Sequence, residues 1–370
     1  MKIAQITPLY EAVPPRLYGG TERVVAQLCE ALVDLGHDVT LFASADARTR
    51  AHLVPVRDQA IRLDKAPLKS DVAAHMSMLA ELRDRRDQFD IIHFHTDMLH
   101  FTMFEDMAAR TVTTLHGRLD LKDLPPVYRR WSKFPLVSIS DAQRVHLPFA
   151  NWVSTVYHGM EADVSSWFSA KPKGYLAFLG RMSPEKGPDR AIEIAKRLGM
   201  PLKMAAKVDA ADAQYFHETI EPLLDHPLIE YIGEIGDAQK PAFLGGAEAL
   251  LFPIDWPEPF GLVMIEAMAC GTPVVGFGCG SAPEVIDDGV TGFLVKDIEG
   301  AVAAVRDIDR LDRREVRRRF DRRFSATAMA RAYLDVYADR LAKLPYAVDL
   351  ADVEDVDEAS ATLTSLAQIA

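Results

Sequence analysis

Residues 257–275 read PEPFGLVMIEAMACGTPVV, and their pattern is the strongest indication of the fold class. A loop stiffened by two prolines follows a predicted strand that ends at Phe252. Gly261 then opens a helix, Gly271 stops it, and a further strand begins at Pro273. Strand, loop, helix and strand in this order predict one unit of a parallel α/β sheet.

The same alternation extends from this stretch in both directions along the chain. The helical segment at 21–35 carries apolar residues with a period of 3.6, as an amphipathic helix does. Strands separated by such helices imply right-handed crossovers and parallel sheets. Predicted strands lie at 2–8, 39–43, 91–94, 111–115, 136–139 and 154–157 in a first series, and at 175–180, 202–206, 229–232, 249–252 and 273–277 in a second.

The two series predict two Rossmann-like, doubly wound domains. The polar segment 169–174 contains Pro and Gly and is typical of a linker, so we place the first domain at 1–170 and the second at 171–325. A helix at 326–344 is expected to pack on either domain, including by crossing back to the first, and an acidic tail follows at 345–370. Open α/β sheets bind ligands at the carboxyl ends of their strands, so two facing sheets predict a central cleft.

Composition and charge exclude several classes of protein. The chain has 370 residues, of which 49% are hydrophobic and 26% charged, as expected for folded domains. Its net charge of −12 argues against nucleic acid as a partner. Half of that excess lies in the tail after Pro345, and seven arginines between 313 and 323 are interpreted as a solvated helix face.

Cysteine usage and the chain's opening residues predict a cytoplasmic protein. The three cysteines have neither a disulfide nor a zinc spacing, which indicates a reducing compartment. Residues 1–10 read MKIAQITPLY, a strand pattern and not a signal peptide, and no run of 18 apolar residues occurs. A basic cluster of Arg129, Arg130 and Lys133 near Trp131 leaves peripheral membrane association open.

The helix predicted from Gly261 carries the first candidate binding residues. Its free N–H groups point at the sheet edge and form an anion site that fits a phosphate. Glu266 lies on an otherwise apolar helix face, where a carboxylate needs a partner such as the hydroxyls of a ribose. Glu258 precedes the helix and is placed to hold hydroxyls of the group that the phosphate carries. The alternatives are that Glu258 caps the helix and that Glu266 pairs with an arginine.

A second candidate lies in FLGRMSPEKG, residues 178–187. Arg181 and Lys186 follow a strand, and two cations five residues apart can reach one diphosphate. On this spacing alone, the simpler interpretation is that Arg181 and Lys186 are ordinary surface residues.

The third and fourth candidates lie in the first half. In LYGGTERVV, residues 17–25, Gly19 and Gly20 allow a ligand to approach the backbone at a helix start, although a tight turn capped by Thr21 fits equally. The segment lacks the GxGxxG fingerprint, so no NAD is proposed. In TTLHG, a strand delivers His116 to its carboxyl end, where it can contact a sugar. His93 and His95 share a strand face, but without a third ligand we predict no metal site.

Together these motifs resemble glycosyltransferase family 4, whose members are retaining enzymes of the GT-B fold. Glu258 and Glu266 match the family's E-x7-E motif, and residues 180–187 look like its phosphate-binding loop. Residues 280–295, GSAPEVIDDGVTGFLV, are similar to the stretch that follows in such enzymes, and the resemblance covers about residues 1–342. His158 and Glu161 depart from the family's usual Asn-Gly-Val/Ile-Asp segment.

The resemblance implies a role for each donor-site residue of the second domain. Arg181 and Lys186 would hold the diphosphate, and Glu266 would bind the ribose. Glu258 would bind hydroxyls of the transferred sugar. Backbone groups would assist at Phe260, Gly261, Leu262 and Val263.

In the first domain, the resemblance places Gly20 against the donor phosphate and His116 beside the donor sugar. It implies retaining transfer of a hexose from a nucleoside-diphosphate sugar, with UDP-sugars expected first and GDP-mannose next. The acceptor would be a sugar, a lipid-linked molecule or a small molecule with a free hydroxyl. No cofactor and no metal are expected.

Three other classes of function share some of these features. A GT-A transferase needs an Asp-x-Asp motif at a strand end, whereas the pairs here lie at 307/309 in a helical region and at 355/357 in the tail. A nucleotide-sugar epimerase of the same shape would also grip a nucleoside diphosphate. A non-catalytic nucleotide-sugar binder is the third.

Overall fold

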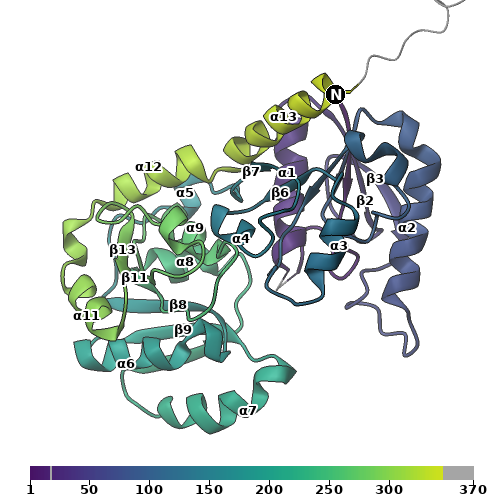
Figure 1. The fold of residues 1–370 in the computed structure, drawn as a ribbon. Helices are drawn as coiled ribbons and strands as arrows, with labels where there is room; N and C mark the ends of the chain where they lie inside the picture. Colours follow the sequence, from purple (N-terminus) through teal and green to yellow (C-terminus); the bar gives the residue numbers. More distant parts are fainter. Residues whose placement is uncertain (17–18, 345–370) are drawn as a thin grey trace, which may run out of the picture.

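A computed structural model describes residues 1–16 and 19–344, which form two α/β domains (Figure 1). Leu17, Tyr18 and the acidic tail after residue 344 lie outside the described residues. Each domain is built on one fully parallel sheet flanked by helices, so the predicted pair of Rossmann-like domains is confirmed. Within the described residues, no helix combines the length and apolar character that crossing a bilayer requires.

The first sheet has seven strands in the order β3-β2-β1-β4-β5-β6-β7. Its central strand β1 is buried at four of its five residues, as expected for a parallel strand covered on both faces. The strands are β1 (Lys2–Ile6), β2 (Asp38–Ser44), β3 (His52–Arg57), β4 (Ile91–Phe94), β5 (Thr111–Thr114), β6 (Leu136–Ser138) and β7 (Trp152–Thr155).

The second sheet has six strands in the order β10-β9-β8-β11-β12-β13. Its strands are β8 (Tyr175–Arg181), β9 (Leu202–Lys207), β10 (Ile229–Gly233), β11 (Ala247–Phe252), β12 (Val274–Phe277) and β13 (Gly292–Val295). Strands β3 and β13 were not among the predicted strands. Both are edge strands that lack a buried apolar run, and β3 also contains Pro55, a residue that edge strands tolerate.

Helices connect the strands and cover both sheets. In the first domain they are α1 (Gly20–Asp34), α2 (Asp71–Arg85), α3 (Leu124–Arg130) and α4 (Asp141–Arg144). Along the rest of the chain they are α5 (Val164–Trp167), α6 (Pro188–Leu198), α7 (Ala213–Tyr215), α8 (Lys240–Gly245), α9 (Leu262–Ala269), α10 (Ala282–Val285), α11 (Ile298–Arg306), α12 (Arg313–Arg323) and α13 (Ala326–Ala342).

The last helix returns to the first domain. Figure 1 shows α12 on the second domain and α13 on the first, where α13 contacts α1. The side chain of Ser325 caps α13 by accepting from the Ala328 N–H at 3.2 Å. Tyr333 and Tyr337 are fully buried in the same apolar cluster as Val24 and Leu28 of α1, so α13 forms part of the first domain's core.

The chain passes between the domains twice, and the two crossings are hydrogen-bonded to each other. The N–H of Met160 donates to the carbonyl of Phe324 at 2.9 Å, and the N–H of Ala326 donates to the carbonyl of Met160 at 3.1 Å. A second link is made by Glu284 of α10, whose carboxylate accepts from the N–H groups of Asp141 and Ala142 at the start of α4, both at 2.7 Å.

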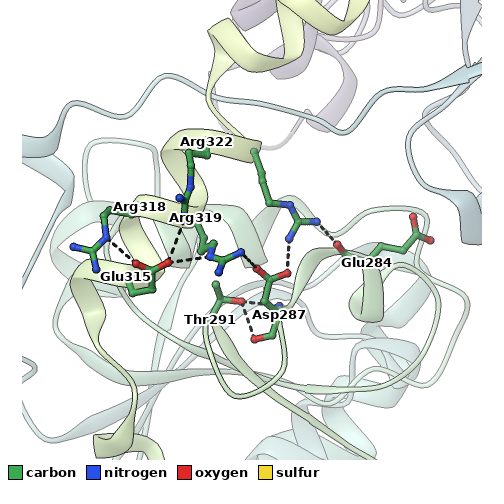
Figure 2. A network of polar contacts seen from close by, with 8 residues as sticks. Glu284, Asp287, Thr291, Glu315, Arg318, Arg319 and Arg322 are labelled. Carbon is green, nitrogen blue, oxygen red and sulfur yellow. Dashed lines mark hydrogen bonds and ion pairs between the residues drawn. The ribbon is translucent and has the colours of Figure 1, made fainter.

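The arginine run on α12 is only partly the solvated face that the sequence suggested. Figure 2 shows the exposed part, where Glu315 accepts from Arg318, Arg319 and Arg322. Arg317, by contrast, is 6% exposed and donates to the carbonyls of Ala269 and Ala162.

Arg313 likewise turns inward and donates to the carbonyls of Ser169, Gly245 and Ala247. The prediction was wrong for these two arginines because they bind backbone carbonyl groups of segments distant in sequence, which charge patterning along one helix cannot reveal.

Both sheets have a switch in strand order, and these switches set the position of the cleft. In the first sheet the order reverses between β1 and β4, and in the second between β8 and β11. Crevices form outside the carboxyl ends of strands at such points. The loops that follow these four strands therefore carry the side chains that can bind a ligand.

A methyl group at Gly159 is predicted to destabilise the protein, because a Cβ there would lie 2.4 Å from the carbonyl oxygen of Ser325 in the other crossing. We expect Gly159→Ala to lower the free energy of unfolding in urea by about 1–3 kcal/mol. Gly236→Ala is the control, since a Cβ at Gly236 meets nothing within 4 Å. If both variants had the same unfolding free energy, close packing of the two chain crossings would not contribute to stability.

Candidate functional site

A cleft of about 560 Å³ lies between the two domains, at the switch points of both sheets. Every candidate site residue from the sequence lines this one cleft, although their contacts with a ligand stay predictions. They are Gly19, Gly20, His116, Arg181, Lys186, Glu258, Phe260, Gly261, Leu262, Val263 and Glu266.

Two helix N-termini face each other across the cleft. α1 begins at Gly20 and α9 begins at Leu262, and a Cβ on Gly20 would lie 3.8 Å from Cδ1 of Leu262. Neither helix has a side-chain cap, so the predicted alternatives, a Thr21 cap and a Glu258 cap, are both wrong. Uncapped N–H groups and the positive ends of two helix dipoles make this an anion-binding position.

Close packing explains the glycines at these helix starts. Gly261 has φ +80°, in the left-handed region, and a Cβ on it would lie 2.8 Å from Cε of Met264. A Cβ on Gly19 would lie 2.7 Å from Cβ of Pro15. Only glycine fits at either position, which keeps the backbone close to the cleft.

Glu258 and Lys186 form an ion pair at the cleft wall. Lys186 Nζ donates to Glu258 Oε2, and Trp256 Nε1 donates to the same oxygen at 3.0 Å. The loop that contains Glu258 is also held by a neighbouring segment, in which the N–H of Ser281 donates to the carbonyl of Glu258 at 2.9 Å. Gly280, with φ +56°, packs against the backbone of Glu258, so the segment after the E-x7-E stretch supports it.

Glu266 pairs with a lysine and not with an arginine. Lys240 Nζ donates to Glu266 Oε1 at 2.6 Å and also contacts Asp237 at 3.1 Å. Asp237 in turn accepts from Arg23 of α1, so a row of alternating charges spans the cleft from one domain to the other. Glu266 is 4% exposed, and the Lys240 ammonium is what makes its buried carboxylate tolerable.

Arg181 stands in an acidic environment. Its guanidinium donates to Glu185 at 2.5 Å and lies 3.7 Å from Asp209 and 3.6 Å from Asp212. Desolvation raises the pKa of Asp212. These carboxylates hold the guanidinium at the carboxyl end of β8, where an anionic ligand would have to compete with them.

His116 lies on the first-domain wall among other histidines. Its Nε2 is 2.8 Å from Nδ1 of His95, and its ring stacks on that of His158 at 5.1 Å between centroids. Burial lowers the pKa of His116 to about 3, so the ring is neutral at pH 7. His158, at the departure from the family pattern, packs its ring edge against Phe260 of the second domain at 4.8 Å.

The histidine pair weighed as metal ligands has a different role. Both nitrogens of His93 are hydrogen-bonded, to Tyr337 at 2.7 Å and Thr114 at 2.8 Å, and both nitrogens of His95 are bonded as well. Across residues 1–16 and 19–344, no three His, Cys, Asp or Glu side chains are grouped to hold a metal ion.

Several cleft residues were not found from the sequence. Trp256 stood two positions before Glu258 and could have been noticed as an aromatic in the same loop. Lys240 and Arg23 gave no local signal, because each meets its carboxylate partner only through the tertiary fold.

Comparison with known proteins identifies the class. A family model described as "Glycosyl transferases group 1" matches residues 160–326, and one described as "Glycosyltransferase Family 4" matches residues 18–172. With two Rossmann-like domains and one cleft at their switch points, the chain is a glycosyltransferase of the GT-B fold.

Individual relatives cover most of the chain. A phosphatidyl-myo-inositol mannosyltransferase of Mycolicibacterium smegmatis is 27% identical over 82% of this chain and 84% of its own length. A glycogen synthase of Mycobacterium tuberculosis is 25% identical over 87% of this chain and 92% of its own length. The crystal structure of AviGT4, a glycosyltransferase involved in avilamycin A biosynthesis, superposes with a TM-score of 0.71 at 25% identity, covering 93% of this chain and 99% of that one.

Removing the Lys240 ammonium is predicted to destabilise the protein through Glu266. Lys240→Met leaves the Glu266 carboxylate buried without a counter-ion and is expected to cost on the order of 3 kcal/mol in unfolding free energy. Adding Glu266→Gln to that variant removes the unpaired charge and is expected to restore most of the loss. Urea denaturation measures both variants. If the changes in unfolding free energy from the two substitutions simply added, the pairing of Lys240 with Glu266 would be contradicted.

Stability is predicted to fall as the pH drops below about 6.5. Burial lowers the pKa of His93, His95, His100, His116 and His158, so below pH 6.5 the unfolded chain binds protons that the folded chain does not. Each ring then contributes a loss that approaches about 1.4 kcal/mol per pH unit below pH 6.5, and this loss fades within about one pH unit above it.

Thermal melting between pH 8 and pH 5 measures this loss. His100→Phe removes one of these rings outside the cleft, and it is expected to flatten the slope by one ring's contribution. A melting temperature independent of pH over this range would show that the rings take up protons in the folded chain as readily as in the unfolded chain, and it would contradict the lowered pKa values.

Proposed function

We propose that this glycosyltransferase transfers a hexose from a nucleoside-diphosphate sugar to a hydroxyl acceptor, with retention of the anomeric configuration and without a metal ion. The observation that carries the proposal is the meeting of two uncapped helix N-termini with Arg181 and Lys186 in one cleft. That combination suits a diphosphate, which carries charge on two adjacent groups. The mannosyltransferase and glycogen synthase relatives both favour a hexose.

The two glutamates would recognise the two hydroxyl-bearing ends of the donor. Glu266 lies on α9 and Glu258 lies just before it, so the carboxylates stand on either side of the helix start. We infer that Glu266 accepts from the ribose hydroxyls and Glu258 from those of the transferred sugar. The lysines that now hold them would keep each carboxylate oriented while the hydroxyls bind.

In this mechanism the leaving diphosphate is stabilised by protein charges. As the bond between the anomeric carbon and the phosphate oxygen breaks, that oxygen becomes more negative, and Arg181, Lys186 and the N–H groups of α9 would oppose the charge. The acceptor oxygen would form its bond on the same face and pass its proton to the leaving phosphate oxygen. By analogy with the loss of one oxyanion donor, removing either cation would cost on the order of 10²-fold in kcat.

The acceptor would bind on the first-domain wall. Outside the donor residues, this wall presents Tyr10, Glu22, Arg62 and Asp97. Burial raises the pKa of Glu22, and the surrounding walls raise the pKa of Asp97 to about 6, although solvent reaches Asp97 through the open cleft. Carboxylates and an arginine in this arrangement suit an acceptor that has several hydroxyls.

The donor site predicts which nucleotide variants lose binding. UDP or GDP, with their sugar conjugates, should raise the melting temperature of the parent, since a ligand that binds only the folded state stabilises it. Glu266→Ala and Lys186→Ala should lose the shift, whereas Lys196→Ala, at an exposed position on α6, should keep it. Thermal shift across UDP, GDP, ADP and their common sugar conjugates is the measurement.

Two further readouts separate the competing functions. An epimerase would leave the nucleotide attached to its sugar, whereas a transferase releases free nucleoside diphosphate only when an acceptor is present. The anomeric configuration of the product, read by proton NMR, tests retention. A parent that no nucleotide stabilises at millimolar concentration would overturn the donor site.

A further inference from the structure

One indole in the cleft contacts three charged side chains. Trp256 Nε1 donates to Glu258 Oε2 at 3.0 Å, and Lys186 Nζ lies 4.8 Å from the centre of the indole ring. Because Lys186 also donates to Glu258, the indole contacts both partners of the ion pair at the cleft wall. The third charge is the guanidinium of Arg118, whose central carbon lies 5.5 Å from the centre of the same ring.

The third of these contacts joins the two domains. Arg118 lies in the loop that follows β5 of the first domain, whereas Trp256 lies in the loop that follows β11 of the second. Both residues line the cleft. A change in the width of the cleft at this point therefore moves a positive charge relative to the indole.

Arg118 is held in place by an acidic neighbour in its own domain. Asp120 accepts from Nε of Arg118 at 2.7 Å and from Nη2 at 2.6 Å, and such a bidentate pair fixes the plane of a guanidinium. A cation over an aromatic face is attracted by the negative charge of that face. The contact between the domains thus depends on the ring of Trp256 and not on its N–H.

The loops that carry Lys186 and Trp256 are tied together through their backbones. The N–H of Asp255 donates to the carbonyl of Glu185 at 2.8 Å, and the N–H of Glu258 donates to the carbonyl of Trp256 at 2.8 Å. These bonds fix the two loops relative to each other. Within the loops, the indole is the side chain that contacts both the ammonium and the carboxylate of the ion pair.

We propose that Trp256 is a positioning residue for Lys186 and Glu258, and that Arg118 acts on this pair across the cleft through the indole. The inference rests on the proposed function, in which Lys186 holds the diphosphate and Glu258 holds the transferred sugar. It assigns two parts of one side chain to two parts of the donor. The indole N–H sets the carboxylate that binds the sugar, and the ring face sets the ammonium that binds the diphosphate.

The contacts of the indole can be measured without any ligand. The chain has four tryptophans, so its ¹H–¹⁵N spectrum contains four indole N–H signals, and Trp256→Phe assigns the one from Trp256. Glu258→Gln should shift that signal because a neutral acceptor replaces a charged one, and Arg118→Gln should shift it because a cation leaves the ring. Arg129→Gln is the control, since Arg129 lies over the Phe149 ring at 4.1 Å, away from the residues that line the cleft. A Trp256 signal that either Glu258→Gln or Arg118→Gln leaves in place would overturn the proposal.

Binding separates the two parts of the indole. Trp256→Phe keeps an aromatic face and loses the N–H, so the affinity for UDP-glucose or GDP-mannose should fall about fivefold while that for UDP or GDP stays within about twofold. Trp256→Leu loses the face as well, and it should also weaken UDP or GDP about fivefold. Isothermal titration calorimetry measures these affinities.

The chain offers a matched control for these variants. Trp152 Nε1 donates to the carbonyl of Leu147 at 2.9 Å, and the Arg144 guanidinium lies 5.6 Å from its ring, but Trp152 is not among the residues that line the cleft. Trp152→Phe should therefore leave both affinities unchanged. Equal losses for the sugar conjugate and the bare nucleotide in Trp256→Phe, or no loss in Trp256→Leu, would overturn the positioning role.

A double variant tests the action of Arg118 through the indole. Arg118→Gln should weaken binding of the sugar conjugate about threefold in the parent and have no effect in Trp256→Leu, where the ring that carries its influence is gone. Additive losses would show that Arg118 acts independently of Trp256, and they would overturn this part of the proposal. If the parent bound no nucleotide, the proposed function would fail, and the ligand-free spectra would still report on the indole contacts.

Discussion

The arrangement of the cleft depends on the hydrogen bonds between the two chain crossings. Met160 bonds on both sides of Ser325, and the clamp of Glu284 on the start of α4 adds a second link between the domains. Each sheet alone offers only half of a site: α1 supplies one helix N-terminus and α9 the other. The bonded crossings bring the two halves face to face and leave the outer side of the cleft open.

Buried charge is the second organising element. Glu258 and Glu266 can stand at the cleft wall because each has an ammonium partner, Lys186 or Lys240. Such pairs contribute little net stability, since desolvation offsets most of their attraction. Their role is geometric: they hold carboxylates and cations at defined places along the cleft, so that a ligand exchanges existing contacts and need not order mobile side chains.

The sequence predicted the fold well because the inner strands are continuous apolar runs. β3 was missed because Pro55 interrupts its apolar run, and β13 because only three apolar residues follow Gly292. Glu258, Glu266 and the glycines at both helix starts were predicted because each departs from its local pattern, as a carboxylate on an apolar face does. The ion pairs of Lys240 and Arg23 could not be predicted, since nothing in the local sequence shows which distant carboxylate each cation will meet.

The return of α13 also bears on the order in which the protein can fold during synthesis. Tyr333 and Tyr337 complete the apolar cluster around α1, yet they leave the ribosome after the whole second domain. The first domain therefore emerges first but must wait, with part of α1 uncovered, while the second domain can complete its own sheet. For this chain the usual rule that domains finish in the order of translation is reversed.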